Sequence, residues 1–336
     1  IGSSIMLAAM DGTCMEEESQ IQSSQFYNFA MSGGKPYSEM IQLPALIEAD
    51  PEVVMIEGGP NSLYGWNESN VHPSIADYHE FRFQLMSMDM SERHVEDWYD
   101  VLDKDDKKYF EIDELGKSEA WSEYSRGALE EYMVREIYEL TSANLNDNGY
   151  AFVPYVNSEE WDDYLSTPNY HISRYEGKSL EYIRDDLDKR MPSKAQQGVY
   201  NPKHNGTQNH RALDYMVHEL LNNSIEVVLV GIPHHPWVND YLQTGQLDGM
   251  NTTYQKYASL DGVTALQMYW EKWPSDAFDN RNHIDGDGRE IFCKRVTPII
   301  DAVINGENPE NVIIDSSVYE IQKNDAELVE QNEECN

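Results

Sequence analysis

The first twelve residues, IGSSIMLAAMDG (residues 1–12), have the pattern of a strand that turns sharply into a helix. We expect Ile1 to end a strand, and residues 5–20, apolar with an acidic end, to form a helix. Ser4 would then lie in the turn, at the start of a helix whose dipole favours negative charge. The stretch therefore marks Ser4 as a candidate nucleophile, with an ordinary helix N-cap as the alternative.

The segments after this turn predict a parallel sheet. Residues 26–30 suit a short strand, and Ser38 is a plausible N-cap for a helix over residues 39–48. Residues 52–57 (EVVMIE) form a β-branched run that is typical of a buried strand. Strands and helices thus alternate along this part of the chain. The alternation implies right-handed crossovers and a parallel sheet.

Later segments continue this pattern after a long interruption. Further buried strands are predicted over residues 225–231 (IEVVLVG) and 263–270, and an amphipathic helix over residues 287–304. In between, aromatic and acidic residues alternate at helical spacing, so we expect a long and mostly helical insertion. Its predicted helices lie near residues 76–88, 91–102, 118–145, 178–190 and 209–222.

The chain is accordingly divided into three parts. Residues 1–65 and 225–305 form the core, and residues 66–224 form the insertion. Residues 306–336 are rich in Glu, Asp and Asn, which predicts a loose acidic C-terminal extension.

The composition indicates a folded protein with a strongly acidic surface. Of the 336 residues, 40% are hydrophobic and 11% aromatic, enough to bury a substantial core. The 61 acidic and 24 basic residues give a net charge of −37. Such a charge repels nucleic acid and anionic membrane surfaces, so we exclude nucleic acid as a partner. Solvated carboxylates in this number are also typical of adaptation to a salty medium.

Cysteine content and hydropathy set further expectations. Cys14, Cys293 and Cys335 are too few and too scattered for a disulfide framework or a zinc site, and we expect no metal and no cofactor. No stretch approaches the roughly 18 apolar residues of a membrane span. Because the sequence opens inside a predicted strand, we expect a targeting segment or a membrane tether upstream of Ile1.

Several polar residues follow the predicted strand ends, which gather at one edge of a parallel sheet. Acyl transfer through serine needs a hydroxyl beside an imidazole, and donors aimed at the developing oxyanion. Ser4 would supply the hydroxyl and His283 the general base. The oxyanion donors would be the backbone N–H groups of Ser4 and Gly33 and the side-chain amide of Asn61. The alternatives are that Gly33 and Asn61 are plain turn residues and that His283 is a surface histidine.

Four short blocks in this order resemble the SGNH (GDSL-type) hydrolase superfamily. Gly2-Ser3-Ser4 is similar to the nucleophile block, with Ser3 where many members carry Asp. Residues 28–33 (NFAMSG) resemble the glycine block, residues 59–62 (GPNS) the Gly-x-Asn-Asp block, and His283 the terminal histidine. The blocks look most like the extracytoplasmic, membrane-tethered branch. That branch includes the D-alanine-transfer protein of teichoic acid synthesis and the alginate O-acetylation proteins.

The resemblance implies a fold and a cysteine pairing. The fold is a flavodoxin-like three-layer α/β sandwich with a parallel central sheet, here interrupted by the long, mostly helical insertion. In this arrangement the first and last helices share one face of the sheet. A disulfide between Cys14 and Cys293, which lie on these two helices, is therefore conceivable.

The chain departs from the family beside the histidine. The family's acid lies three residues before it, where this chain has Asn280, and Asp279 lies one residue further back. Either Asp279 reaches Nδ1 of His283 through a turn, or Asn280 fixes the tautomer as an amide does in Cys-His-Asn sites. Without either, the site is a Ser-His dyad. Ser62 also replaces the family's Asp next to Asn61.

The resemblance implies a serine esterase or O-acyltransferase for O-acyl groups, O-acetyl above all, of an extracytoplasmic glycan. We expect His234, His235 and Trp237 to contact this substrate, with metal binding or loop carbonyls as alternatives for the histidines and packing for the tryptophan. The competing interpretation is an SGNH fold that has lost turnover and binds glycan. The missing family aspartate favours this second interpretation.

Overall fold

A computed structural model defines the fold of the protein. The structure describes residues 1–30, 34–39, 43–63, 175, 177–196, 208–241, 248–284 and 286–313. The predicted helices near residues 76–88, 91–102 and 118–145, and most of the C-terminal extension, lie outside the described residues.

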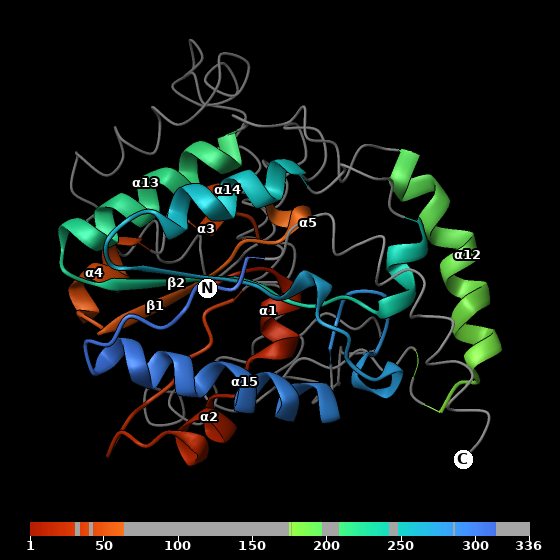
Figure 1. The fold of residues 1–336 in the computed structure, drawn as a ribbon, viewed down its shortest axis with the longest axis horizontal. Helices are drawn as coiled ribbons and strands as arrows, with labels where there is room; N and C mark the ends of the chain where they lie inside the picture. Colours follow the sequence, from red (N-terminus) through yellow and green to blue (C-terminus); the bar gives the residue numbers. More distant parts are fainter. Residues whose placement is uncertain are drawn as a thin grey trace, which may run out of the picture.

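A three-stranded parallel sheet forms the centre of the molecule (Figure 1). Its strands β1 (Val53–Glu57), β2 (Glu226–Gly231) and β3 (Val263–Gln267) lie in the order β1-β2-β3. The register aligns Met55 with Val228, and Val228 with Thr264. The predicted α/β class with a parallel sheet is confirmed.

Single residues extend the sheet beyond both outer strands. The nitrogen of Ile1 donates to the carbonyl of Met55 at 2.7 Å, and the N–H of Glu57 donates to the carbonyl of Ile1 at 3.1 Å. At the other edge, Val312 forms a parallel bridge with Leu266 of β3. Ile1 therefore pairs with β1 as the end of a neighbouring parallel strand would.

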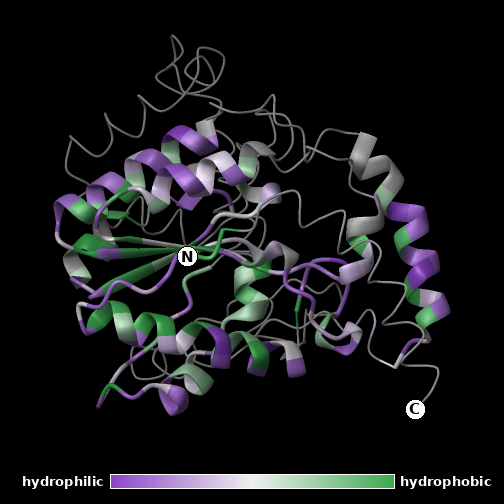
Figure 2. Cartoon of the chain, viewed as in Figure 1, coloured by the Kyte–Doolittle hydropathy of each residue, from purple (hydrophilic) through white to green (hydrophobic). Residues whose placement is uncertain are grey.

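Helices cover both faces of the sheet, and the side chains of β2 alternate between them. Val227 and Leu229 belong to one apolar cluster, and Val228 and Val230 to the other, because successive strand residues point to opposite faces. Figure 2 shows that the strands are among the most hydrophobic parts of the chain. Near-continuous apolar runs of this kind are typical of parallel strands buried on both faces.

Each face has its own helices (Figure 1). One face carries α13 (Gln208–Asn222) and α14 (Asp248–Ala258), together with the short helices α3 (Pro36–Glu39) and α4 (Leu43–Ala49). The other face carries α1 (Ser4–Ala9), α2 (Gly12–Glu18) and α15 (Asp287–Ile304). The predicted helix over residues 287–304 matches α15.

Two helices come from the segment predicted to be an insertion. α13 buries Leu213 and Met216 in the same apolar cluster as β2, so the layer that covers this face begins before residue 225. α12 (Leu180–Gln196) buries Ile183 and Leu187 in this cluster too, and it packs against the 3₁₀ helix η5 (Pro236–Tyr241), which follows β2.

The N-terminal helix differs from its prediction. The predicted helix over residues 5–20 is two helices, α1 and α2, because Met10 is extended and the side chain of Asp11 caps α2 by accepting the N–H of Cys14. The predicted helix over residues 39–48 overlaps α3 at Glu39 and α4 over residues 43–48, and residues 40–42 lie outside the described residues.

Two predicted strands are also corrected. Residues 26–30 are irregular rather than a strand, since side chains take their backbone donors: Glu16 accepts the N–H of Phe26, and Asn28 accepts the N–H of Ala30. The predicted strand over residues 263–270 stops at Gln267, and the 3₁₀ helix η6 (Met268–Trp270) follows.

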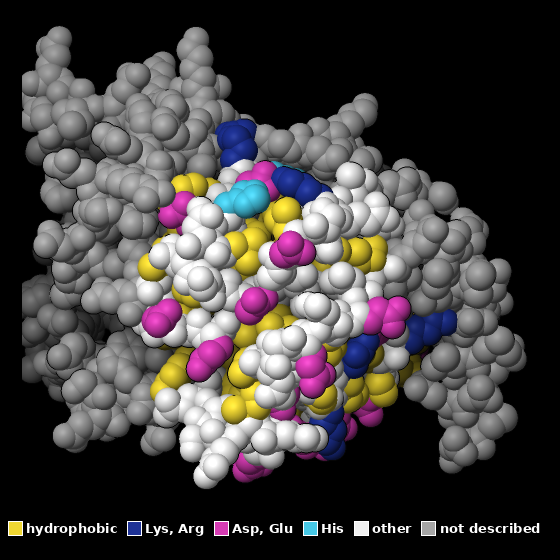
Figure 3. Space-filling model, turned by 60° about the vertical axis from the view of Figure 1, so that its left-hand side comes forward, with side chains coloured by type: hydrophobic (Ala, Val, Ile, Leu, Met, Phe, Trp, Pro, Cys, Tyr) yellow, Lys and Arg dark blue, Asp and Glu magenta, His cyan; other side chains and the backbone are white. Residues whose placement is uncertain are grey.

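The described surface carries acidic side chains, as the composition predicts (Figure 3). In Figure 3, Asp and Glu side chains are spread between apolar ones across the described part of one face. Within the described residues, no helix combines the length and the apolar character needed to cross a membrane.

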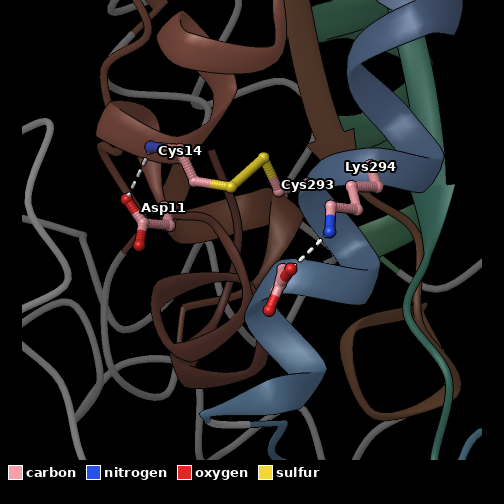
Figure 4. Close-up of a disulfide and its surroundings, with 5 residues drawn as sticks. Asp11, Cys14, Cys293 and Lys294 are labelled. Atoms are coloured by element: carbon pink, nitrogen blue, oxygen red, sulfur yellow. Dashed lines mark hydrogen bonds and ion pairs between the residues drawn. A yellow bond between two sulfur atoms is a disulfide. The ribbon is translucent and has the colours of Figure 1, made fainter.

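A disulfide joins the first and last parts of the core (Figure 4). Cys14 of α2 and Cys293 of α15 are bonded, and their Cα atoms lie 6.2 Å apart. This separation is within the range that a disulfide spans. The bond links positions 279 residues apart in sequence, and the pairing that the sequence left open is present.

We predict that reduction of this bond lowers the free energy of unfolding by about 2–4 kcal/mol, because the cross-link limits the freedom of the unfolded chain. Urea unfolding with and without dithiothreitol measures the change. The double variant Cys14→Ser/Cys293→Ser is the control and should be insensitive to the reductant. A wild-type curve that does not move on reduction contradicts the prediction.

Candidate active site

Ser4 is the first residue of α1, where the chain leaves the edge of the sheet. The preceding residue, Ser3, is the N-cap of the helix, and its Oγ accepts the N–H of Ile5 at 3.2 Å. The alternative in which Ser4 is the N-cap is therefore wrong. The side chain of Ser4 has a different partner.

That partner is His283, from the opposite end of the sequence. Ser4 Oγ lies 2.8 Å from His283 Nε2. His283 is carried by a short loop that an antiparallel bridge between Phe278 and Ile284 closes at its base. The structure thus brings together the two residues predicted to be nucleophile and base.

Asn280 orients the imidazole and determines its tautomer. The Oδ1 atom of Asn280 lies 2.9 Å from His283 Nδ1, and it also accepts the backbone N–H groups of Asn282 and His283, each at 3.2 Å. Two backbone donors identify this atom as the amide oxygen, so Nδ1 must carry the ring proton. Nε2 then has a lone pair that faces the hydroxyl of Ser4, which is the state a general base requires.

The loop that carries the histidine is held by its backbone from two sides. The N–H of Tyr175 donates to the carbonyl of Asp279 at 2.8 Å, and the N–H of His235 donates to the carbonyl of Arg281 at 2.9 Å. Asp279 itself is buried, and its N–H donates to the carbonyl of His283 at 3.0 Å. Of the two candidates for Nδ1, Asn280 places its side-chain oxygen beside this atom, and the backbone of Asp279 closes the loop.

His235 packs inside an aromatic cluster. It is fully buried, and its ring lies 5.0 Å from that of Trp237, 5.6 Å from Phe278 and 6.0 Å from Tyr175. Burial, together with the smaller effects of the nearby His234 and Arg184, lowers the pKa of His235 to about 3, so the imidazole is neutral at physiological pH. Its surroundings favour a packing role.

His234 and Trp237, the other predicted substrate contacts, are buried as well. His234 is 3% exposed and its ring lies 5.2 Å from that of Tyr269, while Trp237 is 7% exposed and has the guanidinium of Arg184 over its ring. Substrate contact by these residues stays a prediction. For Trp237, the packing alternative agrees with its burial.

The predicted oxyanion donors are only partly described. Gly33 lies outside the described residues. Asn61 lies in α5 (Pro60–Leu63), the short helix that directly follows β1, but its side chain is not described. The oxyanion roles of both residues therefore stay predictions.

Two buried carboxyl groups lie behind the turn that carries Ser4, the candidate nucleophile. Neither was predicted from the sequence as part of the site. Glu57, the last residue of β1, accepts two hydrogen bonds from Ser3. Glu39, at the end of α3, is fully buried, and neither of its carboxyl oxygens has a hydrogen-bond partner among the described residues. An acidic residue at the end of an otherwise apolar strand, as in EVVMIE, was the available signal for Glu57.

A cavity of about 560 Å³ lies beside the loop that carries His283. Phe278 and Asp279 of that loop form part of its wall, and Arg289 of α15 forms another part. Its volume is in the range of small-molecule binding sites, and its lining mixes apolar, acidic and basic side chains.

We predict that Glu39 lowers the free energy of unfolding as the pH rises from about 4.5 to about 8. Burial, and to a smaller extent the charge of Glu57, raises the pKa of this carboxyl from 4.5 to about 8. Between these pH values the folded protein holds a proton that the unfolded chain has lost. The free energy of unfolding should therefore decrease with rising pH by on the order of 1 kcal/mol per pH unit, until the carboxyl ionises in the folded protein as well.

The matched variant is Glu39→Gln, which keeps the shape and cannot ionise. Urea unfolding of both proteins between pH 5 and 9 measures the effect, and the variant should lose stability less steeply with rising pH. If the free energy of unfolding falls equally steeply with pH in the wild type and in Glu39→Gln, Glu39 does not carry the expected proton.

Comparison with known protein families and with curated proteins finds no match to this chain. The resemblance of the four short blocks therefore remains a resemblance.

Proposed function

We propose that the protein is an SGNH-type serine esterase or O-acyltransferase that acts on O-acyl groups, chiefly O-acetyl groups, of an extracytoplasmic glycan. The observation that carries the proposal is the 2.8 Å contact between Ser4 Oγ and His283 Nε2, with Nδ1 held by Asn280. A hydroxyl beside an oriented neutral imidazole is the arrangement that activates a serine nucleophile.

In the first half of the proposed reaction, Ser4 Oγ attacks the carbonyl carbon of the ester while its proton passes to His283 Nε2. The new C–O bond creates a tetrahedral oxyanion, which the N–H of Ser4, and by expectation Gly33 and Asn61, would stabilise. The intermediate collapses when the bond to the leaving alcohol breaks. His283 returns its proton to that alcohol oxygen, and the acyl group stays on Ser4.

In the second half, the acyl group leaves the enzyme for an acceptor. His283 takes a proton from water or from a sugar hydroxyl, and the oxygen atom of that water or hydroxyl attacks the carbonyl carbon of the acyl group. The bond to Ser4 Oγ breaks and the proton returns to Oγ. Water gives hydrolysis and a sugar hydroxyl gives transfer, so the acceptor that reaches the acyl-enzyme decides between the two activities.

The proposed fold and location have separate support. Helices on both faces of a parallel sheet are compatible with a flavodoxin-like three-layer sandwich interrupted by an insertion. The Cys14–Cys293 disulfide favours an oxidising and therefore extracytoplasmic environment. We further propose that the protein is located at a membrane, as in the branch that the nucleophile block resembles.

The competing proposal is a glycan-binding module without turnover. It is favoured by the amide of Asn280 in place of a carboxylate, and it expects an imidazole turned away from Ser4. The short Ser4–His283 contact favours catalysis instead. The cavity beside the histidine loop offers polar and aromatic walls, including Tyr175, that suit a sugar in either case.

We predict that Ser4→Ala reduces hydrolysis of p-nitrophenyl acetate to background, a loss of at least about a thousand-fold, because the nucleophile is gone. Labelling of the wild type by a fluorophosphonate should also disappear in the variant. Ser259→Ala, which changes an exposed serine in the turn after α14, is the matched control and should behave as wild type.

If Ser4→Ala still reacts with the fluorophosphonate, the nucleophile is misassigned. The same proteins can be given O-acetylated glycans, with and without an acceptor glycan. Acetate released by the wild type alone identifies an esterase substrate, and acetyl appearing on the acceptor identifies transfer. Glycan binding without either product would support the binding module.

We also predict that Asn280→Asp raises kcat and moves the acid limb of the kcat/KM profile to higher pH. A carboxylate on Nδ1 stabilises the imidazolium, both in the transition state and in the resting enzyme. The shift should be about one pH unit or more. Asn280→Ala should lower kcat, and an unchanged pH profile in Asn280→Asp would contradict the assigned contact.

A further inference from the structure

Glu57 is a buried carboxylate at the point where β1 ends beside the nucleophile turn. It is 1% exposed, and its Oε2 atom accepts both the backbone N–H and the hydroxyl of Ser3, each at 2.7 Å. Hydrogen bonds to a charged acceptor are about twice as strong as those between neutral groups. One oxygen therefore holds the residue that directly precedes Ser4.

The hydroxyl of Ser3 links the Glu57 carboxylate to the first turn of α1. It donates to Glu57 and accepts the N–H of Ile5, so both of its roles are used in fixed directions. Ser4 lies between these two anchored residues, with its Oγ directed at His283. The direction of the nucleophile is thereby tied to the position of the Glu57 carboxylate.

Two glycines leave the space that the Glu57 side chain fills. A Cβ on Gly2 would lie 2.7 Å from Cβ and 2.9 Å from Oε2 of Glu57. A Cβ on Gly59 would lie 3.0 Å from Oε1 of Glu57 and 2.6 Å from the hydroxyl of Tyr269. The carboxylate therefore lies between the turn that carries Ser4 and the turn that leads to Asn61. Its side chain leaves no room for a Cβ at Gly2 and is in tight contact with the Cβ position of Gly59.

We propose that Glu57 is a positioning residue for the nucleophile: through Ser3 it fixes the turn that directs Ser4 Oγ at His283. The inference rests on the proposed serine chemistry and adds to it a residue outside the four short blocks. Glu57 does not touch the substrate in this role. Its loss should therefore slow the chemical step and leave substrate binding nearly unchanged.

Three variants separate this role from simple stabilisation. Ser3→Ala removes the hydroxyl link, Glu57→Leu removes the acceptor, and Glu57→Gln keeps an amide oxygen that can accept both donors. Glu39→Gln is the control, since it alters a neighbouring buried carboxyl that has no hydrogen bond to the turn among the described residues. The readouts are kcat and KM for p-nitrophenyl acetate, the rate of fluorophosphonate labelling, and urea unfolding.

We expect kcat and the labelling rate to fall about tenfold in Ser3→Ala and about a hundredfold in Glu57→Leu, with KM within about twofold, because a small misplacement of a reacting group costs this much. Glu57→Gln should recover most of the activity and Glu39→Gln should match the wild type. If Glu57→Leu does not fold, Ser3→Ala decides the question.

The proposal is overturned if folded Ser3→Ala or Glu57→Leu keeps the wild-type kcat and labelling rate, even when its stability is lower. That result would leave the serine chemistry intact, since Ser4→Ala would still be inactive. If instead Ser4→Ala labels like the wild type, the proposed function fails, and the positioning role fails with it.

Discussion

The parallel register of β1, β2 and β3 is the constraint on which the site depends. Because all three strands run in one direction, the turns after Ile1, after β1 and after β2 emerge at the same edge of the sheet. Each turn leads to one part of the site: the first to Ser4, the second to the helix that contains Asn61, and the third to the loop at His235. A register shift of one residue in β1 would turn Glu57 out of its buried position and would release Ser3.

Two buried polar side chains, those of Asn280 and Glu57, fix the geometry at this edge, and each has specific hydrogen-bond partners. Asn280 directs one oxygen at the imidazole and at two backbone N–H groups, and Glu57 directs one oxygen at Ser3. Leaving such groups unpaired would cost about 1–3 kcal/mol each, so the arrangement is favoured over alternatives that break it. The aromatic cluster around His235 supports the same loop by apolar contact.

Sequence analysis predicted the features that depend on periodicity. The apolar β-branched runs at β1 and β2 and the amphipathic α15 follow directly from the spacing of buried residues. Residues 26–30 have a similar local pattern, yet the side chains of Glu16 and Asn28 take their backbone donors, which no local pattern reveals. Glu57 was read only as the end of a strand, since its role depends on a turn 54 residues away.

Asn280 shows why the charge beside the imidazole at the proposed active site could not be predicted from the sequence. Both Asp279 and Asn280 were candidates, and the choice depends on a loop closed by Phe278 and Ile284. The amide fixes the imidazole tautomer but adds no negative charge to stabilise the imidazolium. Glu39 and Glu57 are already buried behind Ser4, and Asp279 is buried in the loop that carries His283, so a neutral residue at position 280 avoids adding a further buried acidic group. The site therefore depends on orientation more than on charge, which is why the position of the Ser3–Ser4 turn matters so much to it.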